Sequence, residues 1–147
     1  MTVLVGDFLL VHTGARQVGL RLEDVVEVNP LGEVHQVPTS TPALRGVTRA
    51  RDRLVPVLHL GALLGASRCP AEHGSTMVLA RLAGHSLGLE VDEADLITRQ
   101  ELVPVPAGES VPWALAMVRG AKGLIPILNL NAFREQLLEA GAKHDRR

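Results

Sequence analysis

One apolar phrase with a central proline occurs twice in this chain, 70 residues apart. Residues 53–60 read Arg-Leu-Val-Pro-Val-Leu-His-Leu, and residues 123–130 read Gly-Leu-Ile-Pro-Ile-Leu-Asn-Leu. A second phrase, centred on Gly-Leu, occurs at 18–24 and returns at 87–93, an offset of 69 residues. Because the matches keep their order and nearly the same offset, they indicate an internal duplication, so we expect two similar halves. The alternative is a coincidence of composition rich in valine, leucine and proline.

Short apolar runs between turn residues predict about ten strands and an all-β fold, since each run has about five residues and ends at glycine, proline or asparagine. The economical architecture is two small five-stranded barrels that share an aliphatic core, because aromatic residues make up only 2% of the chain. A single ten-stranded sandwich is the structural alternative. The candidate segments for these strands, twelve in all, are residues 8–12, 17–22, 25–28, 33–37, 46–48, 54–60, 76–82, 86–91, 96–99, 102–105, 114–118 and 124–130.

The repeat sets the expected boundaries inside a single domain of residues 1–147. The sub-barrels are predicted at 6–65 and 76–130, with the loop between them as the best linker. Asn131 is a good N-cap for a closing helix at 131–140, and the polar tail 142–147 is expected to fray. Pro56 cannot donate an amide hydrogen bond, so we expect it at a sheet edge or a bulge.

Length, charge and cysteine count exclude several classes. A chain of 147 residues is long enough to bury a stable core without a disulfide or a metal ion. Its net charge of −1 gives no overall positive potential that would attract nucleic acid. Cys69 is the single cysteine, which fits a reducing compartment. The sequence has neither a signal-like start nor an apolar window long enough to span a membrane, so we expect a cytoplasmic protein without direct membrane insertion.

No catalytic, cofactor or metal signature emerges. His85, Ser86 and Asp92 supply the residue types of a hydrolase triad, but nothing places Ser86 on a strained turn beside a base. Cys69 and His73 lack the second ligand pair that a zinc site requires. We therefore expect a binding module without cofactor rather than an enzyme.

The sharpest charge feature is a group of four arginines within nine residues, with Asp52 as the only acid among them: Arg45, Arg49, Arg51 and Arg53. Three interpretations stay open. The group is a solvated turn, a protein-binding patch, or a nucleic-acid site, although the last would want nearby aromatic side chains for stacking.

Several strings together resemble the CheW-like family. They are Val-Val-Glu-Val at 25–28, Val-Pro at 37–38, Leu-Arg-Gly-Val at 44–47, Leu-Val-Pro-Val-Leu at 54–58 and Leu-Gly-Leu-Glu-Val-Asp at 87–92. The resemblance covers nearly all of residues 6–138. Family members are coupling proteins of bacterial chemotaxis and the regulatory domain of their histidine kinase. The resemblance implies two five-stranded SH3-like barrels around a common core, with a receptor helical tip in the groove between barrels and the kinase at the barrel ends.

One turn departs from the family pattern. Where the family usually has Asn-Leu-Arg-Gly, this chain has Arg-Ala-Arg-Asp at 49–52, and the usual Asp and Arg after the proline strand are His59 and Gly61. The resemblance implies that Glu27 pairs with Arg51 and orients the turn. The residues expected to contact partners are Val25, Glu27, Val28, Arg49, Arg51, Asp52, Arg53 and Leu54.

These observations favour a non-catalytic adaptor that couples a chemoreceptor signalling domain to the regulatory domain of a histidine kinase, recruited to membrane receptor clusters. The alternative is a divergent scaffold of the same fold that serves a motility, polarity or other signalling complex. A small hydrolase or metal enzyme is the remote alternative. The sequence leaves open whether the protein assembles into arrays and whether strands are exchanged between its halves.

Overall fold

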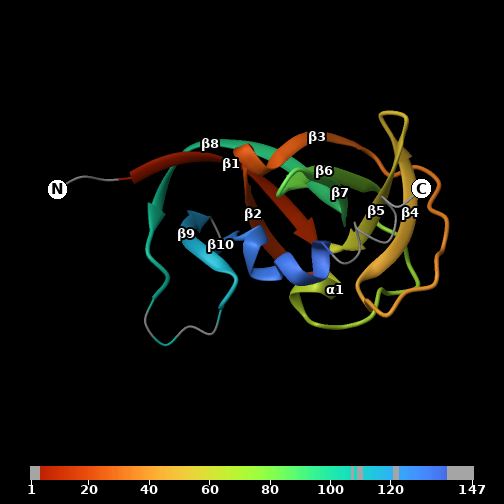
Figure 1. The fold of residues 1–147 in the computed structure, drawn as a ribbon. Coiled ribbons are helices and arrows are strands. Elements are labelled where there is room, and N and C mark those ends of the chain that lie inside the picture. The colour runs from red at the N-terminus through yellow and green to blue at the C-terminus, as the bar shows by residue number, and fades with distance from the viewer. Residues whose placement is uncertain (1–3, 107, 109–110, 121–122, 139–147) are drawn as a thin grey trace.

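The computed structural model describes residues 4–106, 108, 111–120 and 123–138, and within them the predicted all-β fold is confirmed (Figure 1). The first half contains β1 (Leu4–Thr13), β2 (Arg16–Arg21), β3 (Val25–Pro30), β4 (Leu44–Ala50), β5 (Arg53–His59) and the short helix α1 (Leu60–Leu64). The second half contains β6 (Thr76–Leu82), β7 (His85–Val91), β8 (Glu93–Val103), β9 (Ala114–Gly120) and β10 (Gly123–Leu128). Short 3-10 turns lie at η1 (Leu22–Asp24) and η2 (Leu130–Phe133).

Three expected elements differ in detail. The strand expected at 33–37 is reduced to one isolated bridge, between His35 and Val47. The strands expected at 96–99 and 102–105 are one continuous strand, β8. The helix expected at 131–140 begins as the turn η2 and continues as α-helix over 134–138, while the end of that helix and the tail 142–147 lie outside the described residues.

The ten strands form two five-stranded sheets, but each sheet mixes the two halves. One sheet is a closed barrel in the order β1-β2-β10-β9-β8, and the other has the order β3-β6-β7-β5-β4. Each sheet therefore takes the first two strands of one half and the last three of the other. The expected sub-barrels 6–65 and 76–130 do not follow the sheets, because the halves exchange strands reciprocally.

The two repeated phrases explain this exchange, since each proline phrase pairs in parallel with the Gly-Leu phrase of the opposite half. In the barrel, Ile127 is paired with Gly19, and in the second sheet Val57 is paired with Gly88. A Cβ on Gly88 would lie 2.6 Å from the sulfur of Met77 on β6, so a larger residue at position 88 would require the Met77 side chain to move. The repeated phrases thus form the two parallel strand pairs that join the halves.

Pro56 does not lie at a sheet edge, because β5 has β4 on one side and β7 on the other. It is paired with Val47 on β4, while the parallel ladder with β7 starts at Val57. Proline cannot donate to a ladder, so it is tolerated next to the point where the ladder begins. The expectation of a sheet edge was therefore wrong, although a β-bulge lies beside Pro56, where Leu44 and Gly46 on β4 face Leu58 and Val57.

The two sheets differ in how they close. In the barrel, β8 is long enough to pair with β9 through Leu102 and Val103. In the second sheet β3 ends at Pro30, and regular pairing between β3 and β4 is absent among the described residues. The His35–Val47 bridge, with both N–H···O distances at 2.8 Å, lies at the equivalent position. The prediction of two five-stranded units is confirmed. One unit is a closed barrel, and in the other a single bridge stands where a regular strand pair would close the sheet.

One core serves both sheets. Its largest buried cluster includes Leu9 and Leu20 from the barrel together with Leu58 and Leu89 from the second sheet. Leu137, 1% exposed, belongs to the same cluster, so the C-terminal helix packs into the shared core. Among the described residues, no helix is long and apolar enough to cross a membrane.

Candidate partner-binding site

The β4–β5 hairpin turns through two residues with left-handed backbone. Arg51 has φ of 51° and Asp52 has φ of 62°, while Ala50 and Arg53 pair on either side of the turn. A two-residue loop of this kind favours asparagine or glycine, because other side chains cost roughly 1–2 kcal/mol in the left-handed region. Strained turns of this kind cluster at functional sites, so the tip of this hairpin is a candidate contact surface.

The expected ion pair between Glu27 and Arg51 is present. Arg51 donates from Nε to Glu27 Oε1 at 3.1 Å and from Nη2 to Oε2 at 3.2 Å. The hydrogen bond from Arg51, followed by one from Asn29, lowers the pKa of the Glu27 carboxyl. Because β3 and the β4–β5 hairpin lie at opposite sides of the strand order, this pair joins two parts of the sheet that do not pair through their backbones.

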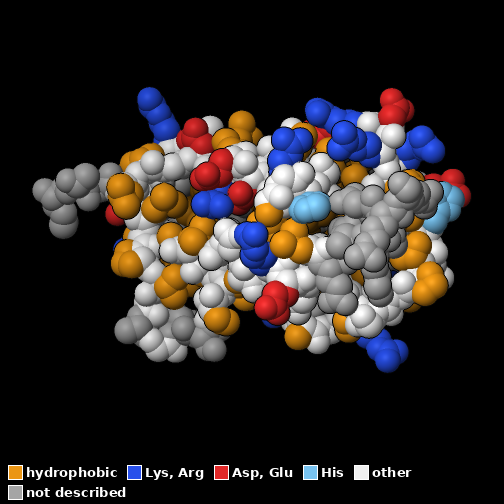
Figure 2. Space-filling model, viewed as in Figure 1, with side chains coloured by type: hydrophobic (Ala, Val, Ile, Leu, Met, Phe, Trp, Pro, Cys, Tyr) orange, Lys and Arg blue, Asp and Glu red, His pale blue; other side chains and the backbone are white. Residues whose placement is uncertain are grey.

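The eight residues expected to bind partners do not form one patch. Arg49 and Leu54 are paired across the hairpin and share one face, whereas alternation along β5 sends Arg53 to the other face. Val28 is 40% exposed on β3, but Val25 packs partly against the main core. Figure 2 shows Lys and Arg side chains gathered where the hairpin projects in Figure 1. The residues therefore give the hairpin two distinct surfaces.

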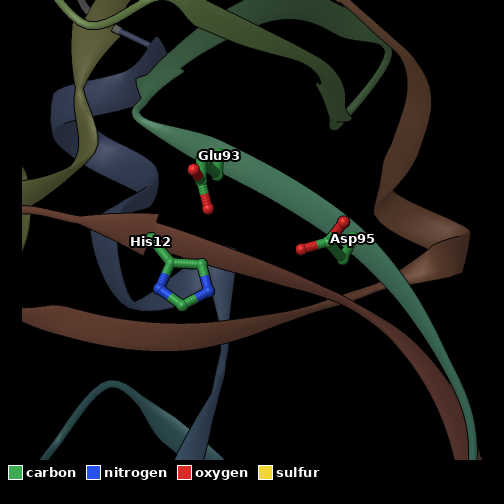
Figure 3. Close-up of side chains that lie close together, drawn as sticks. All are labelled: His12, Glu93 and Asp95. Carbon is green, nitrogen blue, oxygen red and sulfur yellow. The ribbon is translucent and has the colours of Figure 1, made fainter.

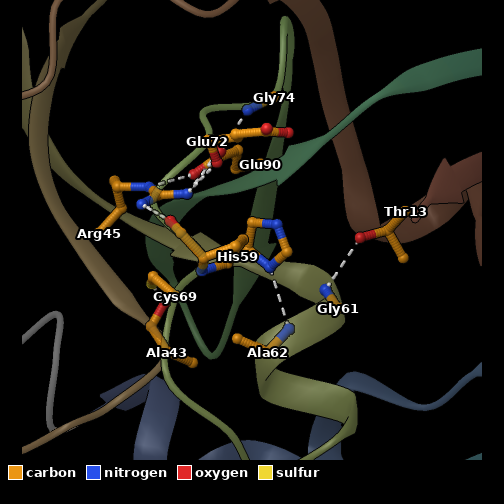
Figure 4. A network of polar contacts seen from close by, with 11 residues as sticks. Thr13, Ala43, Arg45, His59, Gly61, Ala62, Cys69, Glu72, Gly74 and Glu90 are labelled. Atoms are coloured by element: carbon orange, nitrogen blue, oxygen red, sulfur yellow. Dashed lines mark hydrogen bonds and ion pairs between the residues drawn. The ribbon is translucent and has the colours of Figure 1, made fainter.

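Arg45 is not part of the surface arginine group. Its side chain is 8% exposed, and its guanidinium forms a bidentate pair with the fully buried Glu90, with Nε to Oε1 at 2.9 Å and Nη2 to Oε2 at 3.1 Å. It also donates to the carbonyls of Pro70 and Glu72, and the Gly74 N–H donates to Glu90 (Figure 4). The loop at 65–75, expected as a linker, is thus fastened to the second sheet by a buried ion pair.

Burial and hydrogen bonding oppose each other at Glu90. Desolvation acts to raise the pKa of this carboxyl, but hydrogen bonds from Arg45 and the Gly74 N–H outweigh it, so the pKa lies below its ordinary value. Nearby, burial lowers the pKa of His59. His59 Nδ1 accepts a hydrogen bond from the Ala62 N–H at 3.0 Å, which makes it the N-cap of α1. The neutral imidazole, with no proton on Nδ1, is therefore the form that can accept this hydrogen bond.

The residue types of a hydrolase triad are not brought together. Ser86 lies near the start of β7 and Asp92 follows its end, about 20 Å away at the usual rise of a strand. Asp92 Oδ2 accepts a hydrogen bond from the Gly14 N–H instead. Likewise the Cys69 thiol donates to the Ala43 carbonyl at 3.1 Å, and burial raises its pKa.

One group of described side chains offers metal-ligand atoms: His12 on β1 with Glu93 and Asp95 on β8 (Figure 3). His12 and Glu93 are direct cross-strand partners, and the ligand atoms of the three side chains lie within 4.8 Å of one another. Both carboxylates are exposed, and the group carries no functional assignment.

Two residues near the hairpin were not among the expected contact residues. Arg81 and Ser86, paired between β6 and β7, line a small hollow together with Arg51 and Arg53. They come from the second half, so only the strand exchange brings them to this surface. The sequence repeat gives no signal for this placement, because it does not predict the exchange.

Comparisons with known proteins agree on the fold. The CheW-like domain family matches residues 7–136. The crystal structure of the scaffolding protein TtCheW from Thermoanaerobacter tengcongensis superposes with a TM-score of 0.73 at 20% sequence identity, covering 86% of each chain. At this identity the likeness shows the shared fold alone. No curated protein matches the chain.

Proposed function

The chain belongs to the CheW-like domain family, and from this premise we propose that it is a non-catalytic adaptor that couples a chemoreceptor signalling domain to the regulatory domain of a histidine kinase. The observation that carries the proposal is the family match over residues 7–136, which spans both sheets. The adaptor acts in the cytoplasm and is recruited to receptor clusters at the membrane, because its partners are there.

The partner surface in this proposal centres on β3 and the β4–β5 hairpin. Val28 offers exposed apolar area, and Arg51 is held over β3 by Glu27. A helical receptor tip needs apolar anchors in a groove, and an aliphatic surface beside a fixed charge suits that mode of binding. Of the other expected contact residues, Arg49 and Leu54 share one face of the hairpin, Arg53 lies on the other face and Asp52 is at the turn, while Val25 packs against the main core.

Exchanging the charges of the ion pair tests whether it orients this surface. Glu27→Arg and Arg51→Glu are each expected to weaken binding to a receptor signalling domain or a kinase regulatory domain from the same genome, measured by isothermal titration calorimetry. The double variant restores opposite charges and is expected to recover much of the loss. Arg68→Glu, an exposed charge reversal in the 65–75 loop, is the control. A double variant no better than the single variants would contradict the orienting role.

The altered turn supports a second candidate, a divergent scaffold with a partner other than the kinase. Both residues of the hairpin tip are left-handed without being glycine, whereas the family usually has Asn-Leu-Arg-Gly at 49–52. Arg49 and Asp52 then specify that other partner. Unbiased co-purification from the native organism discriminates the two, since recovery of a motility or polarity complex without the kinase favours the second candidate.

A further inference from the structure

The second sheet has a hollow of about 250 Å³ at its hairpin end, lined by three arginines. Its walls include the side chains of Arg51, Arg53, Arg81 and Ser86, and its floor includes the buried Val55 and Leu79. The hollow thus has polar, positively charged walls above an apolar floor, and we call it the arginine mouth.

Strand register explains how residues far apart in sequence meet here. Arg81 on β6 is paired with Ser86 on β7, and β7 is the parallel neighbour of β5. Arg53 and Val55 are two residues apart on β5, so they share a face of the sheet. The mouth is therefore built on regular strands from both halves, with Arg51 reaching in from the turn.

The charges of the mouth are not balanced within the described residues. Arg51 is paired with Glu27, but neither Arg53 nor Arg81 forms an ion pair in the part of the chain that the structure describes. Both are exposed. Like charges that line one hollow repel each other, so an anion bound there would be favoured.

The fold itself does not require arginines at this position. The barrel has an equivalent hollow of about 310 Å³, where Leu10, Gln17 and Ile125 stand 69 or 70 residues from Leu79, Ser86 and Val55. That hollow is mainly apolar, with Phe8 and Val118 among its walls. The same scaffold thus carries an apolar mouth in one sheet and a cationic mouth in the other.

We propose that the arginine mouth binds acidic side chains of a partner protein segment. Arginine forks recognise carboxylates bidentately, as Arg51 already does with Glu27. A nucleic acid fits poorly, because the net charge is −1 and no aromatic side chain lines the mouth. Phosphate sites usually add backbone N–H groups at a helix N-terminus, whereas this mouth is built on strands. The proposal rests on the adaptor function and names the chemistry of one docking segment.

A fluorescein-labelled hexaglutamate peptide serves as the probe, with fluorescence anisotropy as the readout. The wild-type chain is expected to bind it in low salt and to lose affinity in high salt, because salt screens exposed charges. Arg53→Glu combined with Arg81→Glu should weaken binding at least about tenfold, a change of about 1.4 kcal/mol. Arg68→Glu makes the same type of charge change outside the mouth and should change affinity less than about twofold. Circular dichroism verifies that each variant is folded.

In the peptide assay, three results would overturn the proposal: no binding of hexaglutamate by the wild type, equal loss in Arg68→Glu, or displacement of the probe by less pyrophosphate than unlabelled hexaglutamate. The same variants separate this inference from the adaptor function. If receptor and kinase domains bind the double variant as well as the wild type, the inference fails and the adaptor function stands. If hexaglutamate binds at the mouth while neither domain binds the wild type, the adaptor function fails alone.

Discussion

Replacing Arg45 by methionine removes the cation from the buried network and should destabilise the fold strongly. Glu90 is fully buried, and without Arg45 its remaining donor among the described residues is the Gly74 N–H. The carbonyls of Pro70 and Glu72 lose their donor as well. Methionine keeps most of the length and apolar stem of the side chain, so the loss reports chiefly on charge and hydrogen bonding.

Breaking a buried ion pair from one side costs about 3–5 kcal/mol, because the other charge stays buried without compensation. For a chain of this size each 1 kcal/mol shifts the melting temperature by about 2–4 °C, so Arg45→Met should lower it by roughly 6–20 °C. Arg49→Met makes the same change at an exposed site and should alter stability by less than about 0.5 kcal/mol.

Urea denaturation followed by circular dichroism measures the differences in the free energy of unfolding, and thermal denaturation measures the shift in melting temperature. Arg45→Met combined with Glu90→Met is expected to be more stable than Arg45→Met alone, because no buried charge is left unpaired. A loss below about 1 kcal/mol in Arg45→Met, or a double variant less stable than the single variant, would refute the reasoning.

Two further predictions concern individual positions. Because burial lowers the pKa of His59 below its ordinary 6.5, its contribution to stability is present above pH 6.5 and is lost as the pH falls through the lower folded pKa. In denaturation between pH 7 and 5, His59→Asn should lose less stability than the wild type, since asparagine still caps α1; equal losses would contradict this. Asp52→Gly should raise stability by up to about 1 kcal/mol, because glycine relieves the left-handed backbone, and an unchanged or lower urea midpoint would argue against strain at this position.

Short apolar runs predicted most of the strands, and the repeat predicted two similar units with a shared core but not the strand exchange. The proline and Gly-Leu phrases mark which segments are equivalent, yet whether a phrase pairs within its half or across it depends on long-range contacts. The early end of β3 at Pro30 was visible in the sequence, since Asn-Pro stops a strand. Only the structure shows that β3, because it ends there, does not pair with β4 in the second sheet.

The candidate site was partly predictable. The pairing of Glu27 with Arg51 came from family resemblance. The burial of Arg45 was missed because it depends on strands 45 residues apart, although a glutamate within the apolar run at 87–91 signalled that a partner was needed. Arg81 was missed because sequence clustering sees only neighbouring residues.

The central claim is that this chain joins two partners, and size-exclusion chromatography with light scattering tests it directly. The chain, a receptor signalling domain and a kinase regulatory domain from the same genome are mixed together and in pairs. The adaptor account predicts a complex of all three, in which the chain binds each domain separately and both at once. Binding to neither domain, or displacement of one domain by the other, would contradict it.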